Sequence, residues 1–400
     1  MSQLTERYKH YTEPQRVKSL GCYSYFRELE SAQDTVVSYK GKETLMFGSN
    51  SYLGLTNHPY VKEAAIKAVE KYGTGCGGSR FLNGTLDIHV ELEEKLAKFL
   101  NKDAAIAFST GFQVNLGVIP ALAKQGDYIL CDRNNHASII EGCRLSKAST
   151  LFYKHNDMAS LEKKLEHCPP DSFKLIIVDG VFSMEGDIAD LPGIVSLAKK
   201  YKATVMSDCA HGVGVIGEGG RGTASHFGLE KEVEIIGGTF SKSLASIGGF
   251  IASDKDTINF LKHQSRSFIF SASMAPASVA TVIAALDLLQ NDSSLLERLW
   301  DNTNHAIKRF NDLGFDIGET QTPIIPIYVR DYDATFKLST QLLERGVFVN
   351  TVVPPAVNPN DSLIRFSLMA THTTDQIDQA IDEIFNIAVE LDILTKPVAV

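Results

Sequence analysis

Short apolar runs alternate with amphipathic helical segments between residues 104 and 272. Runs of this length, bounded by turn residues, are typical of buried strands. Their alternation with helices predicts a mainly parallel sheet covered on both faces. The predicted strands are 104–108, 128–131, 150–153, 175–178, 203–206, 233–236 and 249–252.

The pattern changes on both sides of this block. The polar first segment contains a predicted helix at 13–19 and a hairpin at 36–45, which suits an arm that packs on another part of the molecule. After a predicted helix at 275–289, a smaller α+β unit is expected, with strands at 323–329, 347–349 and 363–367 and a last helix at 374–391. We therefore expect three parts, which are an N-terminal arm (1–45), a large α/β domain (46–290) and a small C-terminal α+β domain (291–400).

Composition excludes several classes of function. The chain is 44% hydrophobic and 22% charged, as in ordinary soluble proteins, and its net charge of −9 gives no electrostatic case for nucleic acid or an anionic membrane. Six scattered cysteines without a CxxC pair predict neither a metal site nor a disulfide framework, and they fit a reducing cytoplasm. No apolar stretch predicts a signal peptide or a membrane span.

Lys242 is the residue most suggestive of chemistry. It lies in the small-residue stretch 237–243, just after the apolar run 233–236. Such surroundings disfavour the ammonium form, lower the pKa and suit a lysine that forms a Schiff base with a carbonyl, most commonly that of pyridoxal 5'-phosphate (PLP). A lysine at a strand end beside a glycine turn is the alternative.

Asp208 favours the cofactor. It ends the apolar run 203–206, so it lies near Lys242 if both strands belong to one parallel sheet, where ligands bind beyond the carboxyl ends. PLP needs a buried carboxylate facing its pyridine nitrogen. Taken alone, Asp208 could equally cap a helix or shape a turn.

Other polar groups follow predicted strands. Ser109 to Gln113 open a helix whose N–H groups could bind a phosphate, or Ser and Thr could simply cap it. His136 starts a helix, where an imidazole can stack on a cofactor ring or serve as a cap. Ser183 lies in the loop 179–187, within reach of a cofactor's edge.

The remaining candidates lie outside this block or in loops. Arg365 is a cation on an apolar strand and needs a carboxylate or phosphate, with an internal salt bridge as the alternative. Asn50 and Tyr52 could line a pocket or be plain loop residues. The glycine-rich loop 73–85 matches neither a Walker nor a dinucleotide motif. The helix after it is expected to face the core with Val90, Leu92, Leu96 and Phe99.

Together and in this order, these motifs resemble the α-oxoamine synthases. That family comprises PLP enzymes of the aspartate-aminotransferase fold (fold type I) that condense an amino acid with an acyl-CoA and release CO2 and CoA. The resemblance covers the chain from about residue 20 to its end. Segments 47–55, 73–85 and 270–274 are most similar to bacterial members that use L-serine and palmitoyl-CoA for the first step of sphingolipid biosynthesis. That preference for serine comes from the resemblance alone.

The resemblance implies a role for each residue of the cofactor site. Lys242 bonds to the cofactor and later acts as the base at the substrate Cα. Asp208 pairs with the pyridine nitrogen. His211 hydrogen-bonds the cofactor's phenolic oxygen near Ser183. His136 stacks on the ring and helps to hold the substrate carboxylate.

The phosphate would be held by residues from several segments, namely the N–H groups of Gly111 and Phe112, the side chains of Thr239 and Ser241, and Ser271 of the partner subunit. The substrate would be bound by Asn50, Tyr52 and Arg365. Cys209 stands where relatives commonly have an acidic residue, and its side chain is expected to face away from the ring.

The resemblance also implies a homodimer with composite active sites. The lipid-like product makes contact with the inner membrane face an expectation that the acidic charge does not support. Three rivals remain. They are a synthase using glycine or alanine with a shorter acyl-CoA (2-amino-3-ketobutyrate CoA ligase or 8-amino-7-oxononanoate synthase), a lysine-less partner subunit, and an aminotransferase. The presence of Lys242, Asp208 and His136 argues against the lysine-less subunit.

Overall fold

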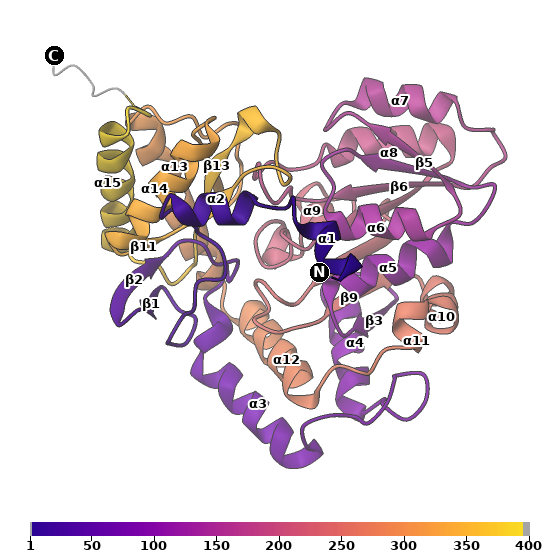
Figure 1. The fold of residues 1–400 in the computed structure, drawn as a ribbon. Helices are drawn as coiled ribbons and strands as arrows, with labels where there is room; N and C mark the ends of the chain where they lie inside the picture. Colours follow the sequence, from indigo (N-terminus) through magenta and orange to yellow (C-terminus); the bar gives the residue numbers. More distant parts are fainter. Residues whose placement is uncertain (1, 395–400) are drawn as a thin grey trace.

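A seven-stranded sheet forms the centre of the larger part of the molecule in the computed structural model, which describes residues 2–394 (Figure 1). Its strand order is β3-β9-β8-β7-β6-β4-β5. Only β9 runs antiparallel to its neighbours, so the predicted mainly parallel sheet is confirmed. The strands are β3 Ala104–Phe108, β4 Tyr128–Asp132, β5 Ser149–Tyr153, β6 Lys174–Asp179, β7 Thr204–Asp208, β8 Ile235–Thr239 and β9 Gly249–Ser253.

Both faces of this sheet are buried. Along β6, Leu175 and Ile177 belong to one apolar cluster, while Ile176 and Val178 belong to the other. Alternate residues of a strand point to opposite faces, so helices must cover both sides. The main helices of this part are α4 Asp87–Phe99, α5 Gly111–Leu122, α6 Ala137–Leu145, α7 Met158–Glu166, α8 Leu191–Tyr201 and α10 Lys255–Gln264.

Strand β8 lies further along the chain than its apolar run predicted, because it includes Gly237 and Gly238. A Cβ atom on Gly238 would lie 2.7 Å from the Phe250 ring of the neighbouring strand. Glycine is therefore required inside the strand for β8 and β9 to pair. As a result, β8 ends closer to Lys242 than predicted.

The predicted core face of α4 is wrong at one position. Leu92, Leu96 and Phe99 are buried as expected, but Val90 is 43% exposed. Two residues correspond to about 200° of helical rotation, so Val90 points away from the face that Leu92 occupies. The buried residues of that face include His89 and Glu93, which an apolar pattern does not reveal.

The C-terminal part has a three-stranded sheet, in the order β10-β13-β12, and three longer helices, which Figure 1 shows beside the large sheet. Its strands are β10 Ile324–Tyr328, β12 Asn350–Val352 and β13 Leu363–Ser367, and its helices are α13 Ser294–Asp312, α14 Tyr332–Glu344 and α15 Thr374–Glu390. Helix α12 (Pro276–Asn291) leads into it and packs along α3 (Pro59–Tyr72).

The predicted strand at 347–349 does not belong to that sheet. Strand β11 (Val347–Phe348) pairs in parallel with β2 (Lys42–Met46), which forms the predicted hairpin with β1 (Val36–Tyr39). The predicted helix α2 (Glu13–Ser19) lies against α14, to which Arg16 is joined by an ion pair with Asp333 (2.9 Å). The N-terminal arm therefore packs on the C-terminal part.

The domain boundaries at 45 and 290 remain predictions, and the first residue of the arm and residues 395–400 of the small domain lie outside the described residues. Within residues 2–394, no helix is long and apolar enough to span a membrane. The short helices are α1 Gln3–Tyr8, η1 Leu55–Asn57, η2 Glu218–Gly220, α9 Thr223–His226, α11 Arg266–Ile269 and η3 Pro359–Asp361.

Candidate active site

A cavity of about 310 Å³ lies at the carboxyl ends of β6, β7 and β8. This is where open α/β sheets bind ligands. Most of the predicted site residues meet here, although they are far apart in the sequence. Those that line the cavity are Gly111, Phe112, His136, Ser183, Asp208, His211, Thr239, Ser241 and Lys242.

Lys242 follows the end of β8, and its amine faces the cavity. Burial lowers the pKa of Lys242 to about 8, although the negative charge of Asp208 acts in the opposite direction. At pH 7 about a tenth of this amine is therefore unprotonated, far more than for a lysine of ordinary pKa. The direction of this shift agrees with the expectation from the sequence, and such an amine can serve as a nucleophile or a base.

Asp208 is the last residue of β7 and is buried. Its Oδ2 accepts a hydrogen bond from Asn115 Nδ2 (2.7 Å), and its Oδ1 accepts one from the backbone N–H of Ala210 (3.1 Å). The carboxylate thus shapes a turn and also borders the cavity. The turn that the sequence allowed for Asp208 is observed, and its side chain also lines the cavity, while its pairing with a cofactor nitrogen stays a prediction.

His136 caps α6 and lines the cavity at the same time. Its Nδ1 accepts from the Ser138 backbone N–H (3.2 Å) and lies 2.7 Å from Ser138 Oγ. Since Nδ1 is an acceptor, the proton of the neutral ring is on Nε2. Asn115 donates to Ser138 Oγ (2.9 Å) as well as to Asp208, so one amide connects Asp208 with the Ser138 hydroxyl that contacts His136.

His211 is neutral because burial holds its pKa well below the usual range, and the charge of Lys242 lowers it further. Its Nδ1 lies 2.7 Å from the hydroxyl oxygen of Tyr52. That oxygen accepts from Arg365 Nη2 (3.1 Å), so the Tyr52 hydroxyl proton is free to donate to His211. The hydroxyl could also donate to Asn50 Oδ1, but that distance is 3.4 Å, so the shorter contact favours donation to His211 and places the ring proton on Nε2.

Arg365 lies on β13 and is buried. Its guanidinium donates to the Ser183 carbonyl (2.6 Å) and to Asn50 Oδ1 (2.9 Å). No carboxylate in residues 2–394 forms a salt bridge with it, so the alternative of an internal salt bridge is not observed. Asn50, Tyr52 and Arg365 form a layer behind the cavity wall and do not line it.

The first turn of α5 and the end of β8 form a cradle for an anion. Thr110 caps the helix through Gln113 N–H, and Gly111 is so close to β8 that a Cβ would lie 2.7 Å from Thr239 Oγ1. Thr239 Oγ1 and Ser241 Oγ lie 2.9 Å apart beside it. Helix N–H groups together with hydroxyls suit a phosphate.

Ser271 does not line the cavity of its own chain. Its Oγ accepts a hydrogen bond from Gln113 Nε2 (3.2 Å). Its predicted role concerns the site of a partner subunit and stays a prediction. Cys209 turns its thiol toward Thr223, whose backbone N–H donates to the sulfur (3.2 Å), and it does not line the cavity, as expected.

Asp179 is a cavity residue that sequence reasoning missed. It is the last residue of β6, directly opposite Asp208 in the sheet, and its Oδ2 accepts from the His136 backbone N–H (2.7 Å). Burial and the charge of Asp208 raise the pKa of Asp179 well above its usual value. Its position at a strand end was the available signal. Asn115 and Ser138 carried no such signal.

These residues fit PLP. An amine, a buried carboxylate and two imidazoles surround a cavity that has an anion cradle at one side. Gly111 supports this fit, because the space its missing Cβ leaves is needed for close approach to Thr239. Lys242, Asp208, His136 and His211 would hold the ring, and the cradle would hold the phosphate.

Comparison with known proteins identifies the family of this chain. Residues 42–384 match the family model described as aminotransferase class I and II. Over 98% of this chain and 100% of the relative, the sequence is 57% identical to serine palmitoyltransferase of Bacteroides ovatus. It is 43% identical to 8-amino-7-oxononanoate synthase of Thermoanaerobacter pseudethanolicus, over 95% of this chain and 96% of the relative.

Among solved structures, the fold matches serine palmitoyltransferase from S. paucimobilis with a bound PLP–myriocin aldimine. The TM-score is 0.96 and the identity is 34%, over 98% of this chain and 100% of that chain. The fold and the cofactor expected from the sequence are thereby confirmed. The chain belongs to the PLP-dependent family of class I and II aminotransferases, and within it to the α-oxoamine synthases.

Proposed function

We propose that this chain condenses L-serine with palmitoyl-CoA and releases 3-oxosphinganine, CoA and CO2. The similarity to serine palmitoyltransferases over nearly the whole chain carries the choice of substrates. The cavity carries the chemistry, because Lys242 and Asp208 lie at adjacent strand ends beside an anion cradle. A lysine-less partner subunit would lack the amine that this site contains.

PLP, when bound, supplies an electron sink for the negative charge that develops at the Cα of the amino acid. Asp208 would hold the pyridine nitrogen in its protonated form, since Asn115 and Ala210 keep the carboxylate in place. The neutral His211 would donate from Nε2, because Tyr52 and Arg365 fix its other nitrogen.

Lys242 would remove the Cα proton of the substrate. Its pKa of about 8 leaves enough free amine near neutral pH, while the conjugate acid stays strong enough to return a proton later. His136 would donate from Nε2 to the substrate carboxylate. Arg365, which lies behind the cavity wall, would hold this end of the site in place through Ser183, and its predicted pairing with the substrate carboxylate would require its guanidinium to move into the cavity during the cycle.

The acyl-CoA would enter on the side where apolar residues border the cavity. Phe112 is 44% exposed and Ile247 is 57% exposed, and both line the cavity. Exposed apolar side chains at a site mouth suit a long acyl chain. This feature favours a long-chain thioester over the short ones that the rival synthases use.

The proposed enzyme is a homodimer with composite sites. Phe270, next to Ser271, is 76% exposed, and a large apolar side chain this exposed suits contact with a partner subunit. In such a dimer, Ser271 of the partner subunit would reach the phosphate cradle. The proposed location is the cytoplasm, where the six cysteines would remain the free thiols that the structure shows.

The test titrates the purified, PLP-loaded protein with L-serine, glycine and L-alanine, and then adds palmitoyl-CoA or acetyl-CoA. We expect L-serine alone to change the absorbance at about 400–430 nm, the range of the lysine-bound cofactor. We expect only palmitoyl-CoA to release CoA. Turnover of glycine or alanine with acetyl-CoA would overturn the substrate choice, and conversion of 2-oxo acids would favour an aminotransferase.

A further inference from the structure

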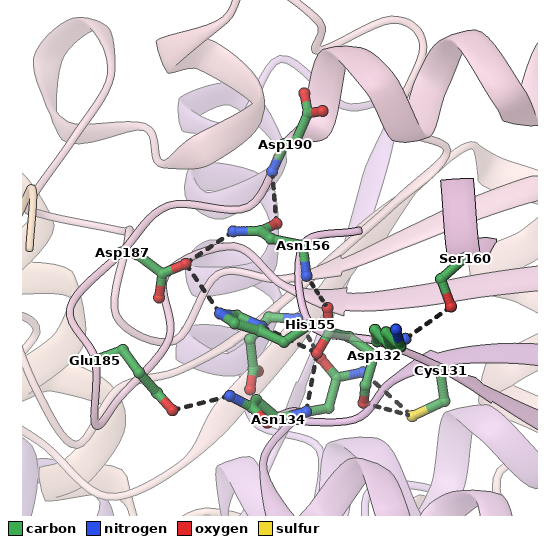
Figure 2. Close-up of polar contacts among 12 residues, drawn as sticks. Cys131, Asp132, Asn134, His155, Asn156, Ser160, Glu185, Asp187 and Asp190 are labelled. Carbon is green, nitrogen blue, oxygen red and sulfur yellow. Dashed lines mark hydrogen bonds and ion pairs between the residues drawn. The ribbon is translucent and has the colours of Figure 1, made fainter. Parts of the chain in front are cut away.

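A polar network outside the cavity is centred on His155, which follows the edge strand β5 (Figure 2). Its Nδ1 lies 3.1 Å from Asp132 Oδ1, and its Nε2 lies 3.1 Å from Asp187 Oδ2. Both carboxylates accept, so both ring nitrogens donate and the ring is an imidazolium. Figure 2 shows the ring between the two acids, which come from different loops.

The positive charge of His155 balances the negative charges of Asp132 and Asp187. Asp132 is fully buried, and within residues 2–394 His155 is the one cation in ion-pair contact with either Asp132 or Asp187. Burial alone would lower the pKa of His155, but its hydrogen bonds to Asp132 and Asp187, together with their charges, raise it to about 10. Glu185 also faces this group, and the charge of His155 acts on it.

The two acids belong to the two loops that bring side chains into the active site. Asp132 ends β4, and its Oδ1 accepts the Asn134 backbone N–H (2.8 Å) in the loop that leads to His136. Asp187 ends the loop that carries Ser183, and its carbonyl accepts a hydrogen bond from the backbone N–H of Phe182 in the same loop. The Phe182 ring packs edge-on against the His155 ring, with 4.3 Å between the ring centroids.

Asn156 reinforces the same connection. Its backbone N–H donates to Asp132 Oδ2 (3.0 Å), and its Nδ2 donates to Asp187 Oδ2 (2.8 Å). Asn134 Nδ2 also donates to Glu185 Oε1 (2.9 Å), directly between the loops. His155 is the only member of this set that carries a positive charge, so its removal leaves acids from both loops without a counter-charge.

We infer that His155 is a positioning residue for this active site, because its imidazolium ties the loop that carries His136 to the loop that carries Ser183. It does not line the cavity and acts only through these loops. This inference rests on the proposed function, in which His136 and Ser183 lie at the cofactor and the substrate carboxylate.

The test compares His155→Gln with His305→Gln in the PLP-loaded enzyme. Glutamine is neutral, so it removes the positive charge that lies between the two acids. The control removes a comparable histidine–aspartate pair, His305 Nε2 to Asp378 Oδ1 (2.7 Å), which joins α13 to α15 away from these loops. The readouts are the dissociation constant of L-serine from the cofactor absorbance, kcat and KM for CoA release, and the melting temperature.

We expect His155→Gln to weaken L-serine binding and to raise KM at least about fivefold at temperatures well below its melting transition, with the control within about twofold of wild type. A purely structural role would lower the melting temperature and leave both constants unchanged, and that result would overturn the inference. If L-serine does not change the cofactor absorbance of the wild-type enzyme, that result would instead overturn the proposed function.

Asp187→Asn provides a second test and decides the matter if His155→Gln does not fold, because it keeps the ion pair between His155 and Asp132. It should weaken L-serine binding by a smaller factor. In the double variant with His155→Gln, the effect of Asp187→Asn should largely disappear, since the two residues act through one contact. Fully independent effects would contradict the inference.

Discussion

Gly111→Ala is the sharpest test of the anion cradle. The added Cβ would lie 2.7 Å from both Cβ and Oγ1 of Thr239, whereas ordinary contacts begin at 3.4 Å. Thr239 must therefore move by about 0.7 Å, the difference between these two distances. Overpacking of this kind costs about 1–3 kcal/mol. Because Thr239 Cβ is attached directly to the backbone of β8, the end of β8 or the first turn of α5 must shift, and either shift distorts the cradle in which a phosphate would bind.

The expected result is a dissociation constant for PLP that rises roughly 5- to 150-fold, since about 1.4 kcal/mol corresponds to a factor of ten. Equilibrium dialysis of the apoprotein against PLP measures it directly. Gly75→Ala is the matched control, because a Cβ there meets nothing within 4 Å and should leave the constant unchanged. A constant for Gly111→Ala within about twofold of wild type would refute the cradle.

Three further predictions concern polar contacts of residues that do not line the cavity. In Arg365→Lys, a single ammonium cannot reproduce the three hydrogen bonds that the guanidinium donates to Ser183, Asn50 and Tyr52. KM for L-serine should therefore rise at least about tenfold in steady-state assays. An unchanged KM would contradict this prediction. Glu93→Gln leaves the buried Arg80 guanidinium without its carboxylate partner, which lies 2.7 Å away between Arg80 Nη1 and Glu93 Oε1. Urea unfolding should show that the free energy of unfolding falls by about 3 kcal/mol. A decrease of less than about 1 kcal/mol would contradict this prediction. The pKa of His155 is raised from 6.5 to about 10, so the stability that its charge contributes should be complete below pH 6.5 and be lost as the pH rises toward 10. The difference in unfolding free energy between wild type and His155→Gln measures this contribution. A difference that grows as the pH rises would contradict the prediction.

Local patterns in the sequence determined the elements and most of the cavity residues. Strands and helices have their own periods, so the seven strands of the large sheet could be located from apolar runs. Because parallel strands end at one edge, polar residues after those runs were bound to meet, and Lys242 and Asp208 do so. The choice of L-serine came from resemblance to known enzymes, since no spacing of residues encodes it.

Only the tertiary structure decided which distant residues pair. The pairing of β11 with β2 joins segments about three hundred positions apart, which no local period can specify. In the same way, packing places Asn115 between Asp208 and Ser138, aims Arg365 at the Ser183 carbonyl and sets His155 between two loops. Such buried polar contacts depend on which surfaces the chain brings together, because a buried group must find its partner in three dimensions.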